Sequence, residues 1–190
     1  MAQGGTVEID ETGADRDGVS EGGEPRWLSE DERRMWVRLV GFTILLPGAV
    51  ESQLKRDAGL TFFEYHVLAM LSEAEGRTRL MSELALWTSA SPSRLSHVVK
   101  RLEQQGWVRR EACASDGRAI NAVLTDEGFA HLAEHAPAHV EEVRRLVFDR
   151  LSSDDVAALS SAMGRMLDGL EGGSCLATEA GVRQERDAAD

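Results

Sequence analysis

The stretch that most restricts the fold of this chain is residues 91–118, SPSRLSHVVKRLEQQGWVRREACASDGR, which predicts a helix followed by a β-hairpin. Ser91 is a favourable N-cap, and Pro92 occupies the first helical position, where its fixed φ suits a helix and its missing N–H is not needed. Apolar residues then recur at the spacing of one helix face: Leu95, Val98, Val99 and Leu102. This stripe predicts a helix that packs on a core through one side.

The opposite side of this helix is polar and has no carboxylate. At 100° per residue it gathers Ser93, His97, Lys100 and Gln104, with Arg94 and Arg101 together on one flank. Such side chains offer hydrogen-bond donors to N7 and O6 of purines and to phosphate oxygens, so we expect this face to enter a DNA major groove. Three residues are expected to read bases: Ser93, Arg94 and His97. Three are expected to hold phosphates: Ser91, Lys100 and Arg101.

A hairpin is predicted directly after Gly106, which ends the helix. Residues 107–111 and 119–124 are strand-like, the second with Ile120, Ala122 and Leu124 on one face, and residues 114–117 supply turn residues. Arg118 at the tip can enter the narrow minor groove, where Asp116 can hold its guanidinium by a charge-assisted hydrogen bond. From the hairpin alone, a surface turn with an Asp–Arg pair is the alternative.

Two helices with capping boxes are predicted before this stretch. The first opens at Ser29 and stops at Gly59, and Pro47 with Gly48 is expected to kink or interrupt it. The second opens at Thr61 and is expected to bury Phe63, Val67, Leu71 and Ala74 before it ends at Gly76. A short helix from about Ser82 to Trp87, with a turn at residues 88–90, then gives the spacing of a helix-turn-helix.

Two further helices are predicted after the hairpin. The one opening at Thr125 is expected to bend at Pro137, and its apolar residues step by three and four: Phe129, Leu132, Ala136, Val140, Val143 and Val147. The last, capped by Ser152, carries a two-heptad seam: Val156, Leu159, Met163, Met166 and Leu170. A small domain has no spare core to cover this seam, so we expect a homodimer joined by the terminal helices. An intramolecular helical hairpin is the alternative.

Five segments in this order resemble the MarR family of winged helix-turn-helix transcriptional regulators: LTFFEYHVLAML, MSELALWT, SPSRLSHVVKRLEQQGWV, DGR and AVLTDEG. The resemblance covers roughly residues 27–170. It implies a mainly α fold with a small β-hairpin wing, a homodimer joined by its N- and C-terminal helices, and a small aromatic or amphipathic effector. His66 is a candidate contact for that effector, but a partly buried structural histidine is the preferred interpretation. The wing departs from the family pattern, because Gly117 stands where the family tends to have an Arg.

The net charge of −12 is concentrated in the two ends of the chain. Residues 1–25 hold seven acids and one Arg, and residues 171–190 hold five acids and two Arg, whereas residues 91–118 carry six Arg or Lys against three acids. The region expected to bind DNA is therefore basic. The predicted division is a disordered acidic tail over 1–26, an N-terminal dimerisation helix over 27–60, a winged helix-turn-helix over 61–124, C-terminal dimerisation helices over 125–170 and a disordered tail over 171–190.

Several classes of protein are not expected. No run approaches a membrane span and no apolar signal region is present, which predicts a cytoplasmic protein without a membrane partner. Cys113 and Cys175 form no C-x-x-C pair, so neither a disulfide scaffold nor a zinc knuckle is expected. The sequence has no Gly-rich phosphate loop, nucleophile elbow or H-E-x-x-H, so we expect neither an enzyme nor a cofactor.

The function predicted from these residues is that of a sequence-specific DNA-binding regulator, a repressor that binds a pseudo-palindromic double-stranded operator as a homodimer and is released by a small effector. One alternative is a winged helix used only for protein–protein contact. Another is a metal-responsive regulator, because His131, His135 and His139 fall at i, i+4 and i+8 of one helix. Pro137 interrupts that stripe and no further ligand completes it, so an exposed polar face is the prediction preferred to a metal site.

Overall fold

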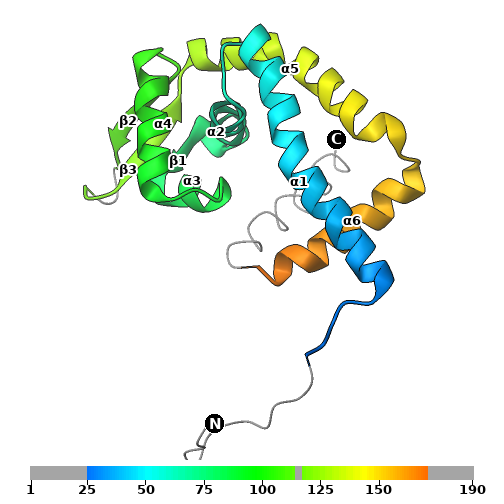
Figure 1. The fold of residues 1–190 in the computed structure, drawn as a ribbon. Helices are drawn as coiled ribbons and strands as arrows, with labels where there is room; N and C mark the ends of the chain where they lie inside the picture. The colour runs from blue at the N-terminus through cyan, green and yellow to red at the C-terminus, as the bar shows by residue number, and fades with distance from the viewer. Residues whose placement is uncertain (1–24, 114–116, 171–190) are drawn as a thin grey trace, which may run out of the picture. The chain divides into compact units, whose positions relative to one another are not determined.

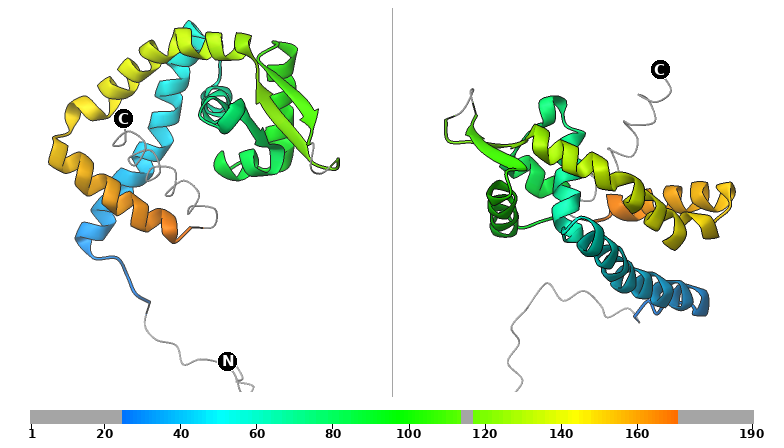
Figure 2. Two further views of the ribbon diagram at one scale, coloured as in Figure 1. Left: turned by 180° about the vertical axis from the view of Figure 1, so that it is seen from behind. Right: turned by 90° about the horizontal axis from the view of Figure 1, so that it is seen from above.

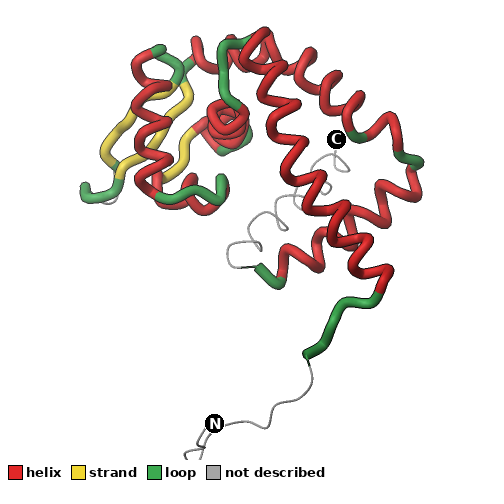
Figure 3. Tube along the Cα trace, viewed as in Figure 1, coloured by secondary structure: helices red, strands yellow, loops and turns green. Residues whose placement is uncertain are grey.

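The computed structural model of the chain describes residues 25–113 and 117–170. The chain divides into two compact units, Met1–Arg38 and Leu39–Asp190, and each is described by itself. The helices are α1 (Glu30–Asp57), α2 (Phe62–Ser72), α3 (Met81–Trp87), α4 (Pro92–Gln104), α5 (Asp126–Leu146) and α6 (Ser153–Asp168), with single 3-10 turns at Glu75–Arg77 and Phe148–Arg150. The strands are β1 (Thr78–Leu80), β2 (Val108–Ala112) and β3 (Ile120–Leu124) (Figures 1 and 3).

The described part of the first unit contains the predicted capping box that opens α1. The backbone N–H of Ser29 donates to Glu32 Oε2 at 2.7 Å, and the backbone N–H of Glu32 donates to Ser29 Oγ at 3.3 Å. Two N–H groups at the helix start are satisfied in this way, which fixes where α1 begins.

Of the two outcomes expected at Pro47, a kink or an interruption, the interruption is wrong, because the helix is continuous through Pro47 and ends at Asp57. Proline removes one backbone hydrogen bond of a helix, and the remaining bonds keep this one intact.

By length and composition alone α1 is also able to cross a membrane, which corrects the expectation that no run approaches a span. Apolar helices that pack on other protein segments pass the same test, so this is weak evidence for a membrane helix.

A three-stranded antiparallel sheet with the order β1-β3-β2 forms the wing. The hairpin confirms the two predicted strands, and Val108 pairs with Leu124 at its base while Ala112 pairs with Ile120 towards its tip. The sequence did not predict β1, which pairs Thr78 with Val123. The sheet lies behind α4 in Figure 1 and in front of it in the left view of Figure 2.

One hydrophobic core joins α2, α3 and α4 to the sheet and to the end of α1. Its most deeply buried side chains are Leu54, Leu60, Val67, Leu68, Leu71, Leu84, Leu95, Val99 and Leu102. The predicted stripe of α4 is thus confirmed, with Val98 half-buried. The predicted stripe of α2 is partly wrong: α2 ends at Ser72, before Ala74, and Phe63 is only half-buried. Ile120 is 42% exposed, because it lies near the hairpin tip rather than over the core.

The two C-terminal helices begin at the predicted caps. Thr125 Oγ1 accepts the backbone N–H of Gly128 at 3.0 Å, and Ser152 forms a capping box with Asp155. The helix α5 is continuous through Pro137, and of its predicted stripe only Leu132 is buried. No residue of α6 is buried in this chain, and its apolar seam is exposed, including Leu159, Met163 and Met166. The helix ends at Asp168, so Leu170 lies beyond it.

Candidate nucleic-acid interface

The candidate interface begins at the N-terminus of α4, which has the predicted cap. Ser91 has extended backbone angles, with φ −65° and ψ 147°, and its Oγ accepts the backbone N–H of Arg94 at 3.3 Å. Pro92 occupies the first turn. The cap fixes the first residue of α4 and therefore the direction in which each later side chain leaves the helix.

All six residues that the sequence selected on or beside α4 are exposed, on the side opposite the core: Ser91, Ser93, Arg94, His97, Lys100 and Arg101. Three residues of the stripe that faces the core, Leu95, Val99 and Leu102, are at most 1% exposed. Burial of this stripe prevents α4 from rotating about its axis, so the polar side stays directed to solvent. The structure thus brings the selected residues of the helix onto one surface.

Arg94 contacts an aromatic ring of α2. Its guanidinium carbon lies 4.1 Å from the ring centroid of Phe63 on α2. A guanidinium stacked in this way is held by its face, and the N–H donors lie along its edge. The donors of Arg94 therefore remain available for a hydrogen-bonding partner.

Arg101 is not a free cation, because it forms an ion pair with Glu64 of α2. Arg101 Nε lies 3.0 Å from Glu64 Oε1, and the Glu64 side chain is only 4% exposed while that of Arg101 is 56% exposed. Glu64 Oε2 also accepts the backbone N–H of Thr61 at 2.8 Å in the capping box of α2. The sequence identified that capping box but gave no signal of the ion pair, since the two residues are far apart along the chain.

Lys100 differs from Arg101 in this respect. It is exposed and makes no ion pair with a residue of the described ranges. On α4, Lys100 is therefore the cation without an ion pair to a described residue, whereas Arg94 and Arg101 each contact a residue of α2.

The wing is fastened to α4 by a second ion pair. Arg110 of β2 donates from Nε to Glu103 Oε2 at 2.8 Å, and its backbone N–H donates to Glu103 Oε1 at 3.0 Å. Arg109 pairs with Glu111 in the same strand. Arg118 is exposed near the tip, whereas Asp116, its predicted partner, lies outside the described residues.

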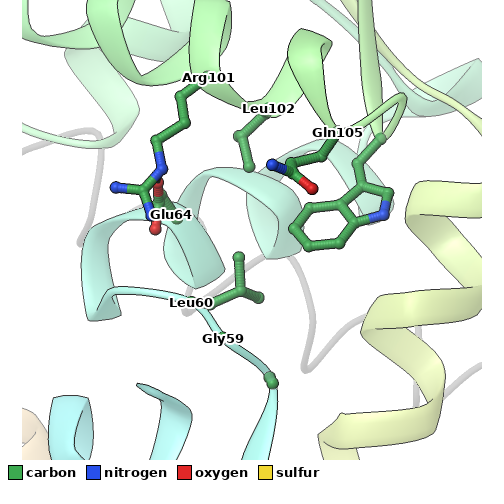
Figure 4. Close-up of a pocket in the computed structure, with 8 residues that line it drawn as sticks. Gly59, Leu60, Glu64, Arg101, Leu102 and Gln105 are labelled. Atoms are coloured by element: carbon green, nitrogen blue, oxygen red, sulfur yellow. Dashed lines mark ion pairs between the residues drawn. The ribbon is translucent and has the colours of Figure 1, made fainter.

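A cavity of about 180 Å³ lies beside the Arg101–Glu64 pair. Its walls come from the loop between α1 and α2, the first turn of α2, the C-terminal part of α4 and the segment between α4 and β2: Ala58, Gly59, Leu60, Glu64, Arg101, Leu102, Gln105 and Trp107. Figure 4 shows Arg101 and Glu64 together on one side of this cavity, with Gln105 further along the same helix. Any molecule in it would touch α4 directly.

His66, the candidate effector contact, is half-buried and does not line this cavity. Burial lowers the pKa of His66 below its ordinary value, and a hydrogen bond with the backbone of Trp87 acts in the opposite direction. The ring also stacks against Phe62, with centroids 6.4 Å apart. His66 thus connects α2 to the end of α3.

The histidines of α5 form no metal site within residues 25–113 and 117–170, where no group of three or more potential ligands lies together. His131 Nε2 lies 3.1 Å from the backbone oxygen of Ala58, and its ring stacks on Trp107 at 4.1 Å. His135 Nδ1 bonds to the backbone oxygen of His131, and His139 packs on Tyr65. The three are half-buried, so the predicted exposed polar face is also wrong. These aromatic contacts come from other elements and have no local sequence signal.

A helix-turn-helix whose second helix presents a polar face beside a three-stranded wing defines a winged helix-turn-helix protein. Comparison with known proteins narrows this class. A profile of the MarR family matches residues 58–119. The HTH-type transcriptional repressor Rv2887 of Mycobacterium tuberculosis is 39% identical over 118 residues, which make up 60% of this chain and 83% of that protein.

Solved structures agree with this match. The crystal structure of Sco3205, a MarR family transcriptional regulator from Streptomyces coelicolor, in complex with DNA, has a TM-score of 0.75 and 43% identity, over 79% of this chain and 94% of that one. The structure of AbsC, a MarR family regulator from the same organism, has a TM-score of 0.74 and 40% identity, over 78% of this chain and 99% of the other. The chain belongs to the MarR family of transcriptional regulators, which are not enzymes.

Proposed function

We propose that this protein is a sequence-specific transcriptional repressor that acts in the cytoplasm and binds a pseudo-palindromic operator through the exposed face of α4. The observation that carries the proposal is the division of α4 into an apolar stripe that packs on the core and an exposed face without carboxylates. Ser93, Arg94 and His97 would contact bases in the major groove. The repressor name of Rv2887 and the DNA in the Sco3205 crystal support the same function.

The remaining contacts would hold the backbone of the duplex. Lys100, Arg101 and the hydroxyl of Ser91 would bind phosphates on either side of the groove. Arg118 would enter the adjacent minor groove from the wing tip, where A·T-rich sequence narrows the groove and strengthens its negative potential. Its replacement by Ala is expected to flatten the log–log salt dependence of binding by about 0.9.

The proposed repressor is a homodimer, because a two-fold operator requires two copies of α4. The exposed apolar seam of α6 supports this assembly, since such a face on one chain calls for a second surface to cover it. The two α4 helices would then enter successive major grooves about 34 Å apart.

A small aromatic effector would regulate binding most directly from the cavity beside Arg101. Arg101, Leu102 and Gln105 belong to α4 and its C-terminal end, so a molecule in contact with them can favour one position of the recognition helix over another. His66 is not among the residues that line this cavity and is a less direct contact.

The proposal is tested by selection of bound duplexes from a random-sequence DNA pool, followed by affinity measurements across a salt series. We expect one pseudo-palindromic sequence to be enriched, with affinity that falls steeply as salt rises, because phosphate contacts release counterions. Footprinting on DNA upstream of the protein's own gene provides an independent test. A protein that enriches no sequence and shows no salt-dependent binding is instead a protein–protein interaction module, the role that the net charge of −12 would favour.

A further inference from the structure

Two consecutive residues of α2 hold the two arginines on one flank of α4. The ring of Phe63 lies 4.1 Å from the guanidinium carbon of Arg94, and the Glu64 carboxylate lies 3.0 Å from Nε of Arg101. Both arginines are exposed, whereas Glu64 is buried and Phe63 is half-buried. The two contacting residues of α2 thus lie on the core side, and the two arginines lie at the surface.

The charge of Glu64 is not required for the start of α2. Its side chain accepts the backbone N–H of Thr61 at 2.8 Å and the hydroxyl of Thr61 at 2.9 Å. A glutamine at this position of a capping box accepts the same backbone N–H without a charge. The ion pair with Arg101 (Figure 4) is therefore what the carboxylate adds to the cap.

A buried carboxylate directly behind a DNA-binding face is unfavourable by Coulomb's law, since it repels phosphates. It also costs desolvation energy unless a cation compensates it. Arg101 supplies that cation, and the same ion pair restricts the arginine to one region of the helix surface. Restriction before binding lowers the side-chain entropy that an arginine loses when it contacts DNA.

Phe63 acts on Arg94 by a different interaction with the same result. A ring below the guanidinium plane attracts the cation and leaves its edge donors free for a planar, two-point contact such as O6 and N7 of guanine. A leucine at this position would fill a similar volume against the core but would present no π face.

We propose that Phe63 and Glu64 are positioning residues that orient Arg94 and Arg101 of the recognition helix before DNA arrives. The inference rests on the proposed function, because it assigns how the binding face is arranged. Phe63 would act on base recognition through Arg94, and Glu64 on phosphate binding through Arg101. Loss of either is expected to weaken binding about two- to tenfold, the range given by one ordered side chain.

The decisive variant is Glu64→Gln, measured against the duplex recovered by selection and a scrambled duplex of equal length. Removal of a negative charge near DNA should strengthen binding if charge alone matters. We expect the opposite: weaker binding to both duplexes, with a flatter salt dependence. In an Arg101→Ala background the same change should no longer weaken binding, since the cation it positions is gone.

Lys100 provides the matched control, because it lies next to Arg101 and has no ion pair with a described residue. Glu64→Gln should weaken DNA binding by the same factor in a Lys100→Ala protein as in the parent. Circular dichroism and thermal unfolding of every variant establish that equal fractions are folded. If the role of Glu64 is purely structural, Glu64→Gln should change the melting temperature and should weaken DNA binding equally in the parent and in the Arg101→Ala protein.

If Glu64→Gln fails to fold, the measurements on Phe63 still test the proposal. Phe63→Leu should weaken binding to the selected duplex more than to the scrambled one, and should have no effect in an Arg94→Ala background. The positioning inference is overturned if Phe63→Leu, and Glu64→Gln where it folds, change DNA affinity by the same factor with and without their arginines. It is also overturned if they tighten binding. The proposed function stands in both cases. A parent that binds no duplex in a salt-dependent manner overturns both.

Discussion

The side chain of Glu103 on α4 binds both the backbone N–H and the guanidinium of Arg110 on β2, at 3.0 and 2.8 Å. The hydrogen bond with Glu103 raises the pKa of Arg110 above its ordinary value, and both side chains are about one third exposed or less. The wing is therefore attached to α4 near the C-terminal end of that helix. In the proposed complex with DNA, the position of the wing relative to the groove would depend on this pair.

Glu103→Gln should loosen the wing, because it removes the charge from a pair that is largely shielded from water. We expect about 1 kcal/mol less stability to urea and a several-fold loss of affinity for the selected duplex. Glu111→Gln is the control, since Glu111 pairs with Arg109 within one strand, and both are more exposed. Equal effects of the two substitutions would show that the Glu103–Arg110 pair has no special role.

Gly128 of α5 lies against the backbone of Trp107, the residue directly before β2. A Cβ at this position would lie 2.2 Å from the backbone oxygen of Trp107, which also accepts the backbone N–H of Thr125 at 3.0 Å. Gly128→Ala should therefore destabilise the fold by about 1–3 kcal/mol in urea unfolding. Gly48→Ala in α1 is the control, because a Cβ there meets no atom within 4 Å and alanine favours helix. Unchanged stability of Gly128→Ala would mean that this junction adapts freely.

Burial of His66 predicts a pH dependence of stability. The pKa of His66 is lowered in the folded chain, so below an unfolded pKa of about 6.5 the unfolded state binds more protons. The free energy of unfolding should fall as pH decreases through that region and should be constant above it. Burial lowers the pKa of His139 in the same direction, so His66→Gln should reduce the slope without abolishing it. A variant with the slope of the parent would exclude His66 as the cause.

Met163→Asp tests the proposed dimer. It places a charge in the exposed apolar seam of α6, and burial of an unpaired charge in an interface is strongly unfavourable. The variant should sediment as a monomer or unfold, and its affinity for the selected duplex should fall. Ser161→Asp on the opposite side of α6 can pair with Arg165 and should leave the dimer intact. A parent protein that sediments as a monomer at micromolar concentration would rule out this assembly.

The elements of this protein that the sequence predicted are those with local signals. The caps at Ser91 and Thr61, the apolar spacing of α4 and the glycine that ends it are all read within a few residues, and the structure confirms them. The side of α4 that faces solvent follows from the same spacing. Local patterns therefore defined the candidate binding face before any contact between elements was known.

The features that the sequence did not predict depend on residues brought together by folding. β1 has only three residues and forms because β3 provides a partner. The ion pair of Arg101 with Glu64 and the stacking of His131 on Trp107 join different helices and loops. The prediction of an exposed polar face at His131 and its neighbours is wrong for the same reason. Contacts with other elements partly bury an imidazole that helical spacing alone places at the surface.

The most direct test of DNA recognition by α4 compares Arg94→Ala and Lys100→Ala on the selected and the scrambled duplex. Arg94→Ala should cost about 1–3 kcal/mol of binding on the selected duplex and less on the scrambled one, because a base contact carries sequence information. Lys100→Ala should weaken both duplexes alike and flatten the salt dependence, because a phosphate contact does not. If both variants fold normally and bind both duplexes as the parent does, the exposed face of α4 does not recognise DNA.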